Sequence, residues 1–167
     1  MNDRWQRRII VGVSGSRASQ AALGWAVGEA KLRNAALHVL HVWHPLQHPA
    51  LYAGSAASRA AGRERQDARD RLAAVMRTEF GTTPPDGVTA ELAEGAPERV
   101  LVERSAGIDL LVIGSAAVAE QPGWSAGPVV RACLMKARSP LVIITTTVRP
   151  PANLTTSRQV PATMSTV

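Results

Sequence analysis

Two short apolar runs with a helical pattern between them constrain the fold of this chain more than any other feature. Residues 108–113 and 141–144 are almost continuously apolar and bounded by turn residues, as is typical of strands that helices cover on both faces. The segment between them has the spacing of an inward-facing helix stripe at Val130, Cys133, Leu134 and Ala137. Two such strands form a right-handed parallel crossover, so residues 114–129 are expected at the carboxyl end of the sheet, where α/β folds bind ligands.

The same alternation of strand and helix patterns runs through the rest of the chain. Five strands are predicted: Arg8–Val13, Ala36–Trp43, 88–93, 108–113 and 141–145. Four helices are predicted: one from an N-cap at Ser16 to about Arg33, one over 57–80, one from Pro97 and one from Pro128. This order is typical of an α/β fold, a doubly wound five-stranded parallel sheet with helices on both faces. A single domain over residues 1–147 is expected.

Two segments do not follow this alternation. Residues 44–62 are rich in proline, histidine, alanine and glycine, and they are predicted to form a long loop that is either mobile or functional. Residues 148–167 contain few large apolar side chains and many proline, threonine and serine residues. Because such a segment buries too little apolar surface to order itself, a disordered C-terminal tail is predicted.

The composition argues against a membrane-spanning, secreted or nucleic-acid-binding protein. Hydrophobic residues make up 46% of the chain, yet no apolar run approaches the roughly 20 residues of a membrane span. The sequence MNDRWQRRIIVGV has no small-residue cleavage site, and a single cysteine rules out a disulfide within the chain. A cytoplasmic protein without a membrane partner is therefore expected. The net charge is +6, but the arginines of residues 59–77 alternate with acidic residues and lack interleaved aromatic rings, so nucleic acid is not expected as a partner.

Glycines punctuate the segment after the fourth predicted strand. Gly114, Gly123 and Gly127 precede a helix start at which Gly127 fits the N-cap and Pro128 the first helical position. Free N–H groups and the positive end of the helix dipole would converge there, as an anion such as phosphate requires. The alternative is a plain surface connection, because the pattern is neither a dinucleotide fingerprint nor a Walker motif.

Three ordered segments resemble the universal stress protein family over about residues 8–146. IIVGVSGSRASQAALGWAVGEAKLRNAALHVLHVW resembles the first βαβ unit of that family, GAPERVLVERSAGIDLLVIGS its third helix and fourth strand, and SPLVII its last strand. The resemblance implies a sheet in the order 3-2-1-4-5 with a switch point between the first and fourth strands. It also implies a role in stress response and a homodimer that pairs through the last strand, at Leu141, Val142, Ile143 and Ile144.

Many members of that family bind ATP through a motif written G-x2-G-x9-G-[ST]. The spacing is intact here, but Ala117 replaces the second glycine and Pro128 replaces the final Ser/Thr. Ser14 stands where the family commonly has an aspartate. The nucleotide-binding positions that the resemblance implies are Val13, Ser14, Val42, Gly114, Ser115, Ala117, Gly127, Pro128 and Val129.

Each departure has a physical meaning. Pro128 lacks a hydroxyl and an N–H that could meet phosphate, a loss of about 1–3 kcal/mol. Ala117 would cost about 1 kcal/mol if the position needs positive φ, and Ser14 removes a carboxylate. Together these changes amount to a few kcal/mol, or about a hundredfold or more in affinity. Compensating groups are Ser115, Ser125 and Arg131, whereas Glu120 would oppose an anion, and Trp124 either plugs the cleft or stacks on a ligand.

Other chemistry has less support in the sequence. His38 and His41 are predicted on opposite faces of a strand, so with His44 and His48 they make a weak metal site, and no metal is expected. Cys133 lies on the apolar stripe of a helix and is interpreted as a core residue. Ser14 and Ser16 have no recognisable base, so no enzymatic activity is expected. Two hypotheses remain: a non-catalytic, dimeric interaction module with a degraded nucleotide site, or an ATP-binding protein in which the nucleotide is a conformational switch.

Overall fold

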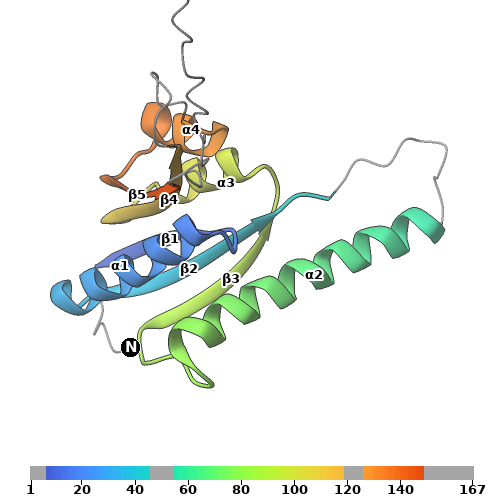
Figure 1. Cartoon of the computed structure of the whole chain (residues 1–167), viewed down its shortest axis with the longest axis horizontal. Coiled ribbons are helices and arrows are strands. Elements are labelled where there is room, and N and C mark those ends of the chain that lie inside the picture. Colours follow the sequence, from blue (N-terminus) through green and yellow to red (C-terminus); the bar gives the residue numbers. More distant parts are fainter. Residues whose placement is uncertain (1–6, 46–54, 119–125, 149–167) are drawn as a thin grey trace, which may run out of the picture.

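The computed structural model describes residues 7–45, 55–118 and 126–148, which form a five-stranded sheet with helices on both faces (Figure 1). The elements in chain order are β1 (Arg8–Val13), α1 (Arg17–Arg33), β2 (Ala36–Trp43), α2 (Ser55–Phe80), β3 (Val88–Glu94), α3 (Pro97–Arg104), β4 (Leu110–Val118), α4 (Pro128–Lys136) and β5 (Leu141–Val148). All strand pairs are parallel, in the order β3-β2-β1-β4-β5. The predicted fold class and strand order are therefore confirmed. Among the described helices, none has the length and apolarity that a membrane crossing needs.

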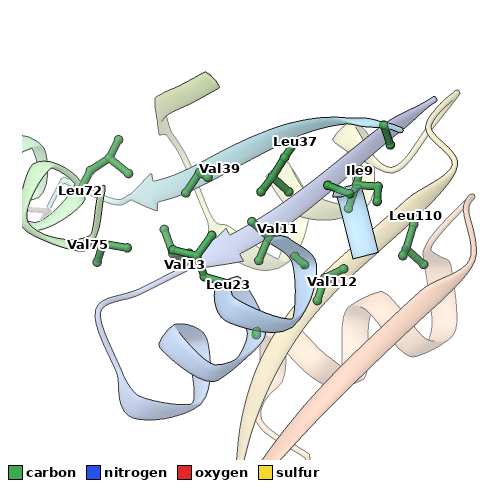
Figure 2. Packing of buried hydrophobic residues seen from close by; sticks show 14 residues of the cluster. Ile9, Val11, Val13, Leu23, Leu37, Val39, Leu72, Val75, Leu110 and Val112 are labelled. Carbon is green, nitrogen blue, oxygen red and sulfur yellow. The ribbon is translucent and has the colours of Figure 1, made fainter. Parts of the chain in front are cut away.

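Each face of the sheet has its own hydrophobic core. In β1, Ile9 and Val11 are fully buried toward α1 and α2, whereas Ile10 belongs to the cluster toward α3 and α4. Figure 2 shows the first cluster, in which Leu23 of α1 and Val75 of α2 pack over the strands. Full burial of such an aliphatic side chain is worth about 2 kcal/mol relative to exposure. Two covered faces explain why the strands are almost continuously apolar in sequence.

The fourth and fifth strands are longer than the sequence predicts. β4 starts at Leu110 and continues to Val118, so the predicted loop start at Gly114 is wrong. β5 continues three residues past the predicted end, to Val148. The two extensions pair residue for residue, from Gly114 opposite Ile144 to Val118 opposite Val148, and the threonine-rich sequence of β5 favours this strand. The predicted phosphate loop therefore begins as part of the sheet.

Two helix predictions also need correction. α2 begins at Ser55, so the predicted loop over residues 44–62 is wrong from Ser55 onward. Its first turns contain four alanines, the residue with the highest helix propensity, at Ala56, Ala57, Ala60 and Ala61. In α4 the predicted stripe is right for Val130 and Cys133, but Leu134 is 53% exposed. This nine-residue helix lies beside the edge strand β5, where it buries only a narrow stripe.

Some predictions fall on residues that the structure does not describe. They concern His48, the four loop residues Glu120, Gly123, Trp124 and Ser125, and the tail from residue 149 onward.

Candidate functional site

The carboxyl end of β1 leads into a tight turn that starts α1. Gly15 has φ +84°, a conformation that glycine adopts without steric cost. Ser16 is the N-cap of α1, as predicted, and its Oγ accepts a hydrogen bond from the Ser19 amide at 3.2 Å. The Ser14 hydroxyl donates to Ser16 Oγ at 3.1 Å. The first turn of α1 is thereby fixed at the point where β1 ends.

That first turn lies directly against β4 at Gly114. A Cβ atom added to Gly114 would lie 2.2 Å from the carbonyl oxygen of Ala18 and 2.6 Å from the amide nitrogen of Ser19. Both contacts involve backbone, which cannot rotate away, so a larger residue would displace α1 from the sheet. Gly114 therefore has a packing role that does not depend on any ligand.

A cavity of about 200 Å³ lies beside this contact, between the carboxyl ends of β1 and β4, and we call it the switch-point cavity. Its walls include five of the nine predicted site residues: Val13, Ser14, Val42, Gly114 and Val129. Pro97 and Leu101 of α3 also line it, and the sequence analysis did not assign them to the site. The signal that could have found them is the helix start at Pro97. Helices that follow parallel strands all begin at the carboxyl edge of the sheet.

Three helix N-termini contribute to the walls of the switch-point cavity. Ser19 lies in the first turn of α1, Pro97 is the first residue of α3 and Val129 is the second residue of α4. The N-caps of α3 and α4, Ala96 and Gly127, give their helices no side-chain hydrogen bond. Pro97 and Pro128 have no N–H, and the Arg99 amide donates to the Ala96 carbonyl oxygen at 3.0 Å. No side-chain cap therefore competes with an anion for the N–H groups that remain in these first turns. The described residues that line the cavity include no charged side chain, so attraction would come from backbone groups and the hydroxyls of Ser14 and Ser19.

The other four predicted site residues do not line this cavity. Ser115 is buried within β4, and Ala117 lies in the same strand opposite Thr147. A strand backbone is extended, so the position of Ala117 does not need positive φ and the expected strain cost does not arise. Gly127 has φ −58°, and a Cβ added to it would meet nothing within 4 Å. The glycine at this position is therefore not required by the backbone.

Pro128 and Arg131 face a different part of the surface. Pro128 is the first residue of α4, a position at which its missing N–H leaves no bond of the helix unmade. With Arg131 and Lys136 it lines a separate surface hollow of about 420 Å³. Arg131 does not line the switch-point cavity. In the described part of the chain, Arg131 is therefore not placed to compensate for the phosphate contacts that the motif has lost.

A second cavity, of about 510 Å³, lies between the end of β2 and α2, and we call it the α2 cavity. It shares Ser14 and Val42 with the switch-point cavity, so the two meet at these residues. Its other walls are more polar and come from both elements: His41, Trp43, His44, Glu64, Asp67, Ala68 and Arg71. In the sequence, the charges of residues 59–77 show only an alternation of arginines with acidic residues, which gives no signal that they approach the end of β2.

The two histidines of β2 point to opposite faces of the sheet, as predicted. His41 belongs to the side of α2, where its Nδ1 lies 2.7 Å from the Val13 carbonyl oxygen. On the other side, His38 contacts Thr89 Oγ1 at 2.7 Å and Glu91 Oε2 at 2.9 Å. Hydrogen bonds from the Arg104 guanidinium hold the pKa of Glu91 below its usual value. Within the ranges that the structure describes, no three potential ligands group into a metal site.

Cys133 lies in the core between α4 and the sheet. It is 1% exposed and belongs to the cluster formed with Val130 and Leu101. Burial raises the pKa of its thiol, so the reactive thiolate is disfavoured. These observations agree with its interpretation as a core residue.

The fold and the position of the site can now be compared with known proteins. The family model described as Universal stress protein family matches residues 6–145, which is most of the chain. The chain belongs to the universal stress protein family. Universal stress protein Rv2623 of Mycobacterium tuberculosis (strain ATCC 25618 / H37Rv) is 30% identical over 141 residues, which cover 83% of this chain and 45% of that protein. Universal stress protein Rv3134c of the same strain is 30% identical over 161 residues, or 96% of this chain and 56% of that protein.

The chain thus spans about half the length of these two members of the family. Among solved structures, universal stress protein UspA from Lactobacillus plantarum matches with a TM-score of 0.65 at 24% identity. The match covers 86% of this chain and 99% of the other. It supports the universal stress protein fold for the described sheet and helices.

Proposed function

We propose that this chain is a non-catalytic regulatory domain of the stress response in the cytoplasm, with a degraded nucleotide site and a function carried by protein interactions. One observation carries the proposal: the switch-point cavity measures about 200 Å³, and none of the described residues that line it has a charged side chain. The family motif positions Ala117 and Pro128 lie outside its walls. A triphosphate bound there would therefore meet few groups able to replace its hydration.

The non-catalytic part of the proposal rests on the surroundings of the serines. The Ser14 hydroxyl is hydrogen-bonded to Ser16 Oγ, and Ser19 Oγ donates to the Ser16 carbonyl oxygen at 2.9 Å. These contacts hold the start of α1, and none of them involves a general base that could activate a hydroxyl. Assays with nucleotide and ester substrates should therefore give no turnover above the buffer rate. Turnover abolished by Ser14→Ala would contradict this part.

The interaction partner proposed first is a second copy of the chain, through β5. This strand lies at the edge of the sheet, and its apolar residues are only partly buried: Leu141, Val142, Ile143 and Ile144. An edge strand leaves N–H and C=O groups that a second strand can pair with. Sedimentation at micromolar concentrations should show a dimer, and Ile143→Pro should weaken it. The Pro140 carbonyl oxygen accepts from Leu111 of β4, so the N–H of Ile143, three residues on, points to the free edge of the sheet. A monomer at every concentration would contradict the dimer.

The second candidate function is an ATP-binding switch, as the family resemblance implies. The uncapped N-termini of α3 and α4 at the switch-point cavity favour it. Mass spectrometry first shows whether a nucleotide co-purifies with the protein. Calorimetry then measures ATP binding to the nucleotide-stripped protein, with and without magnesium, and this separates the two functions. We expect no micromolar ATP binding and no effect of magnesium. Micromolar binding that requires the triphosphate would favour the switch.

A gain-of-function variant sharpens this test. Pro128→Ser restores the hydroxyl and the N–H of the family motif, so it should raise ATP affinity by about tenfold or more if loss of these groups degraded the site. Pro140→Ser is the matched control, because Pro140 precedes β5 and lines neither cavity. Equal ATP affinity in both variants would show that Pro128 is not the cause.

A further inference from the structure

Another cavity lies at the opposite end of the sheet from the switch-point and α2 cavities, and we call it the amino-end cavity. Its volume is about 260 Å³, larger than that of the switch-point cavity. It lies between the carboxyl end of α1 and the first residues of β2 and β3. No described residue that lines it also lines the switch-point cavity or the α2 cavity, so it is a separate space.

The floor of the amino-end cavity is apolar. It is formed by buried Leu37, which Figure 2 labels, by buried Ala30 and Ala35, and by partly buried Val27 and Val88. Because two of these residues are alanines, the end of α1 and the start of β2 leave a space that larger side chains would fill. An apolar group of a ligand would gain by entering this space, since its surface would leave water.

Backbone hydrogen bonds fix the walls around this floor. α1 ends at Asn34, which has φ 51° and whose amide donates to the last turn of the helix. On the other side the Val88 amide donates to the Pro85 carbonyl oxygen at 3.1 Å and closes a tight turn. The Leu37 amide donates to the Gly87 carbonyl oxygen at 2.8 Å, which ties this turn to β2. The cavity is therefore formed before any ligand binds, as is usual for small-molecule sites.

Two side chains of opposite charge line this cavity: Lys31 from α1 and Asp86 from the turn before β3. Both are exposed, and within the described ranges neither makes an ion pair or a side-chain hydrogen bond. They border one space but do not contact each other. A ligand between them could therefore pair with both, and Asn34 adds an amide group beside Lys31.

We propose that the amino-end cavity binds an α-amino acid with an apolar side chain. The carboxylate of the ligand lies next to Lys31, its ammonium group next to Asp86, and its side chain over the apolar floor. A fatty acid or a simple amine would leave one of the two protein charges unpaired. A volume of about 260 Å³ is below the roughly 300–1,000 Å³ of sites for drug-sized molecules, so it suits a ligand of this size. The inference goes beyond the proposed function, because this site needs neither a nucleotide nor a protein partner.

Calorimetry with the full chain, stripped of co-purifying small molecules, tests the ligand class. The probes are leucine, glycine, and two analogues that keep the carbon skeleton of leucine but carry one charge each: 4-methylpentanoate and 3-methylbutylamine. We expect leucine to bind, and the other three to bind more weakly by about fivefold or more, because each lacks one of the three contacts. Equal affinity for leucine and either analogue would overturn the zwitterion, and equal affinity for glycine would overturn the role of the floor.

Two variants assign the charges to their partners. Asp86→Asn should weaken leucine binding by about fivefold, since the pair is at an exposed rim, and should not change the affinity for 4-methylpentanoate, which has no ammonium group. Lys31→Gln should weaken leucine binding similarly and should not change the affinity for 3-methylbutylamine. Asp70→Asn and Lys136→Gln are the matched controls, because neither residue lines the amino-end cavity. Leucine affinity that is equal in a variant and its control would overturn the contact in question.

A spectroscopic measurement on the unaltered protein tests Lys31 directly. The chain has only two lysines, Lys31 and Lys136, so protein labelled with carbon-13 at the lysine ε carbon gives two side-chain signals. The Lys136→Gln variant assigns them. Saturation with leucine should shift the Lys31 signal and leave that of Lys136 unchanged, since Lys136 lines the separate hollow beside α4. An unchanged Lys31 signal, or equal shifts of both signals, would overturn the site.

The outcomes separate this inference from the proposed function. If leucine does not bind, the inference fails, while the interaction domain with a degraded nucleotide site stands. If leucine binds and ATP also binds at micromolar concentration through its triphosphate, the proposed function fails and the amino-acid site stands.

Discussion

The two cavities at the carboxyl end of the sheet are adjacent, but they are built in different ways. The described walls of the switch-point cavity are mostly glycine backbone and apolar side chains, with Ser14 and Ser19, and they lie beside the contact between Gly114 and the first turn of α1. The walls of the α2 cavity are polar side chains such as His41, Asp67 and Arg71. A backbone-built cavity cannot change its residues without moving elements of the fold. A cavity lined by side chains can change its ligand while the fold stays intact, so specificity is expected to reside on the α2 side.

The largest effect should follow from a change at the backbone contact. Gly114→Ala places a methyl group 2.2 Å from the Ala18 carbonyl oxygen, and we expect it to lower the free energy of unfolding by about 3 kcal/mol or more. Urea denaturation measures the loss. Gly127→Ala is the matched control in the same family motif, since its Cβ would meet no atom within 4 Å, and its cost should stay below about 1 kcal/mol. Equal losses in the two variants would contradict the packing role of Gly114.

The same contrast explains what the sequence could and could not predict about the fold. Burial on both faces produces continuous apolar runs, so β1, β2 and the sheet order could be predicted from pattern and resemblance. The end of β4 could not be predicted, because glycine, alanine and serine at residues 114–117 have no strand preference of their own. Their conformation comes from pairing with β5. Tertiary pairing thus overrode local propensity there.

The residues of the candidate site also divide into those that the sequence could predict and those that it could not. Val13, Gly114 and Val129 belong to motif positions of the family, and the structure brings them to one cavity. Asp67 and Arg71 had no motif, and they are more than 20 residues from His41 in the sequence. Only the packing of α2 beside β2 and β3 brings them to the same cavity. Side chains that meet through a long helix leave no local pattern, which is why the α2 cavity could not be predicted.

A smaller effect is expected from changes to the serines at the start of α1, where Ser14 lines both cavities. Ser16→Ala removes the hydroxyl that accepts from the Ser19 amide, and loss of an N-cap costs about 1 kcal/mol. Ser14→Ala is the control, because the exposed Ser14 hydroxyl caps no helix, and its cost should be within about 0.5 kcal/mol. Thermal unfolding of both variants measures the difference. A larger loss for Ser14→Ala would mean that this serine, rather than Ser16, holds the turn.

The smallest effect is expected for a polar cluster on the other face of β2. In contrast to the α2 cavity, this cluster has its hydrogen-bonding groups already paired within the protein. His38 and Arg104 both bond to the Glu91 carboxylate, and both ring nitrogens of His38 have partners. Such a saturated cluster should stabilise the fold without binding a ligand. Glu91→Gln is therefore expected to lower stability by up to about 1 kcal/mol at pH 7, since the ion pair is partly exposed.

The effect of Glu91→Gln should also depend on pH. Because the pKa of Glu91 is lowered in the folded state, its contribution is fully present above the ordinary value of 4.5 and is lost as pH falls through the folded pKa. Urea midpoints of the variant and the unaltered protein should therefore converge as the pH falls below the ordinary value of 4.5 and through the lowered pKa. Glu103→Gln is the control, since its pair with Arg99 is 77% and 61% exposed and should contribute under about 0.5 kcal/mol. A stability difference that is constant with pH would mean that Glu91 acts through packing rather than through its charge.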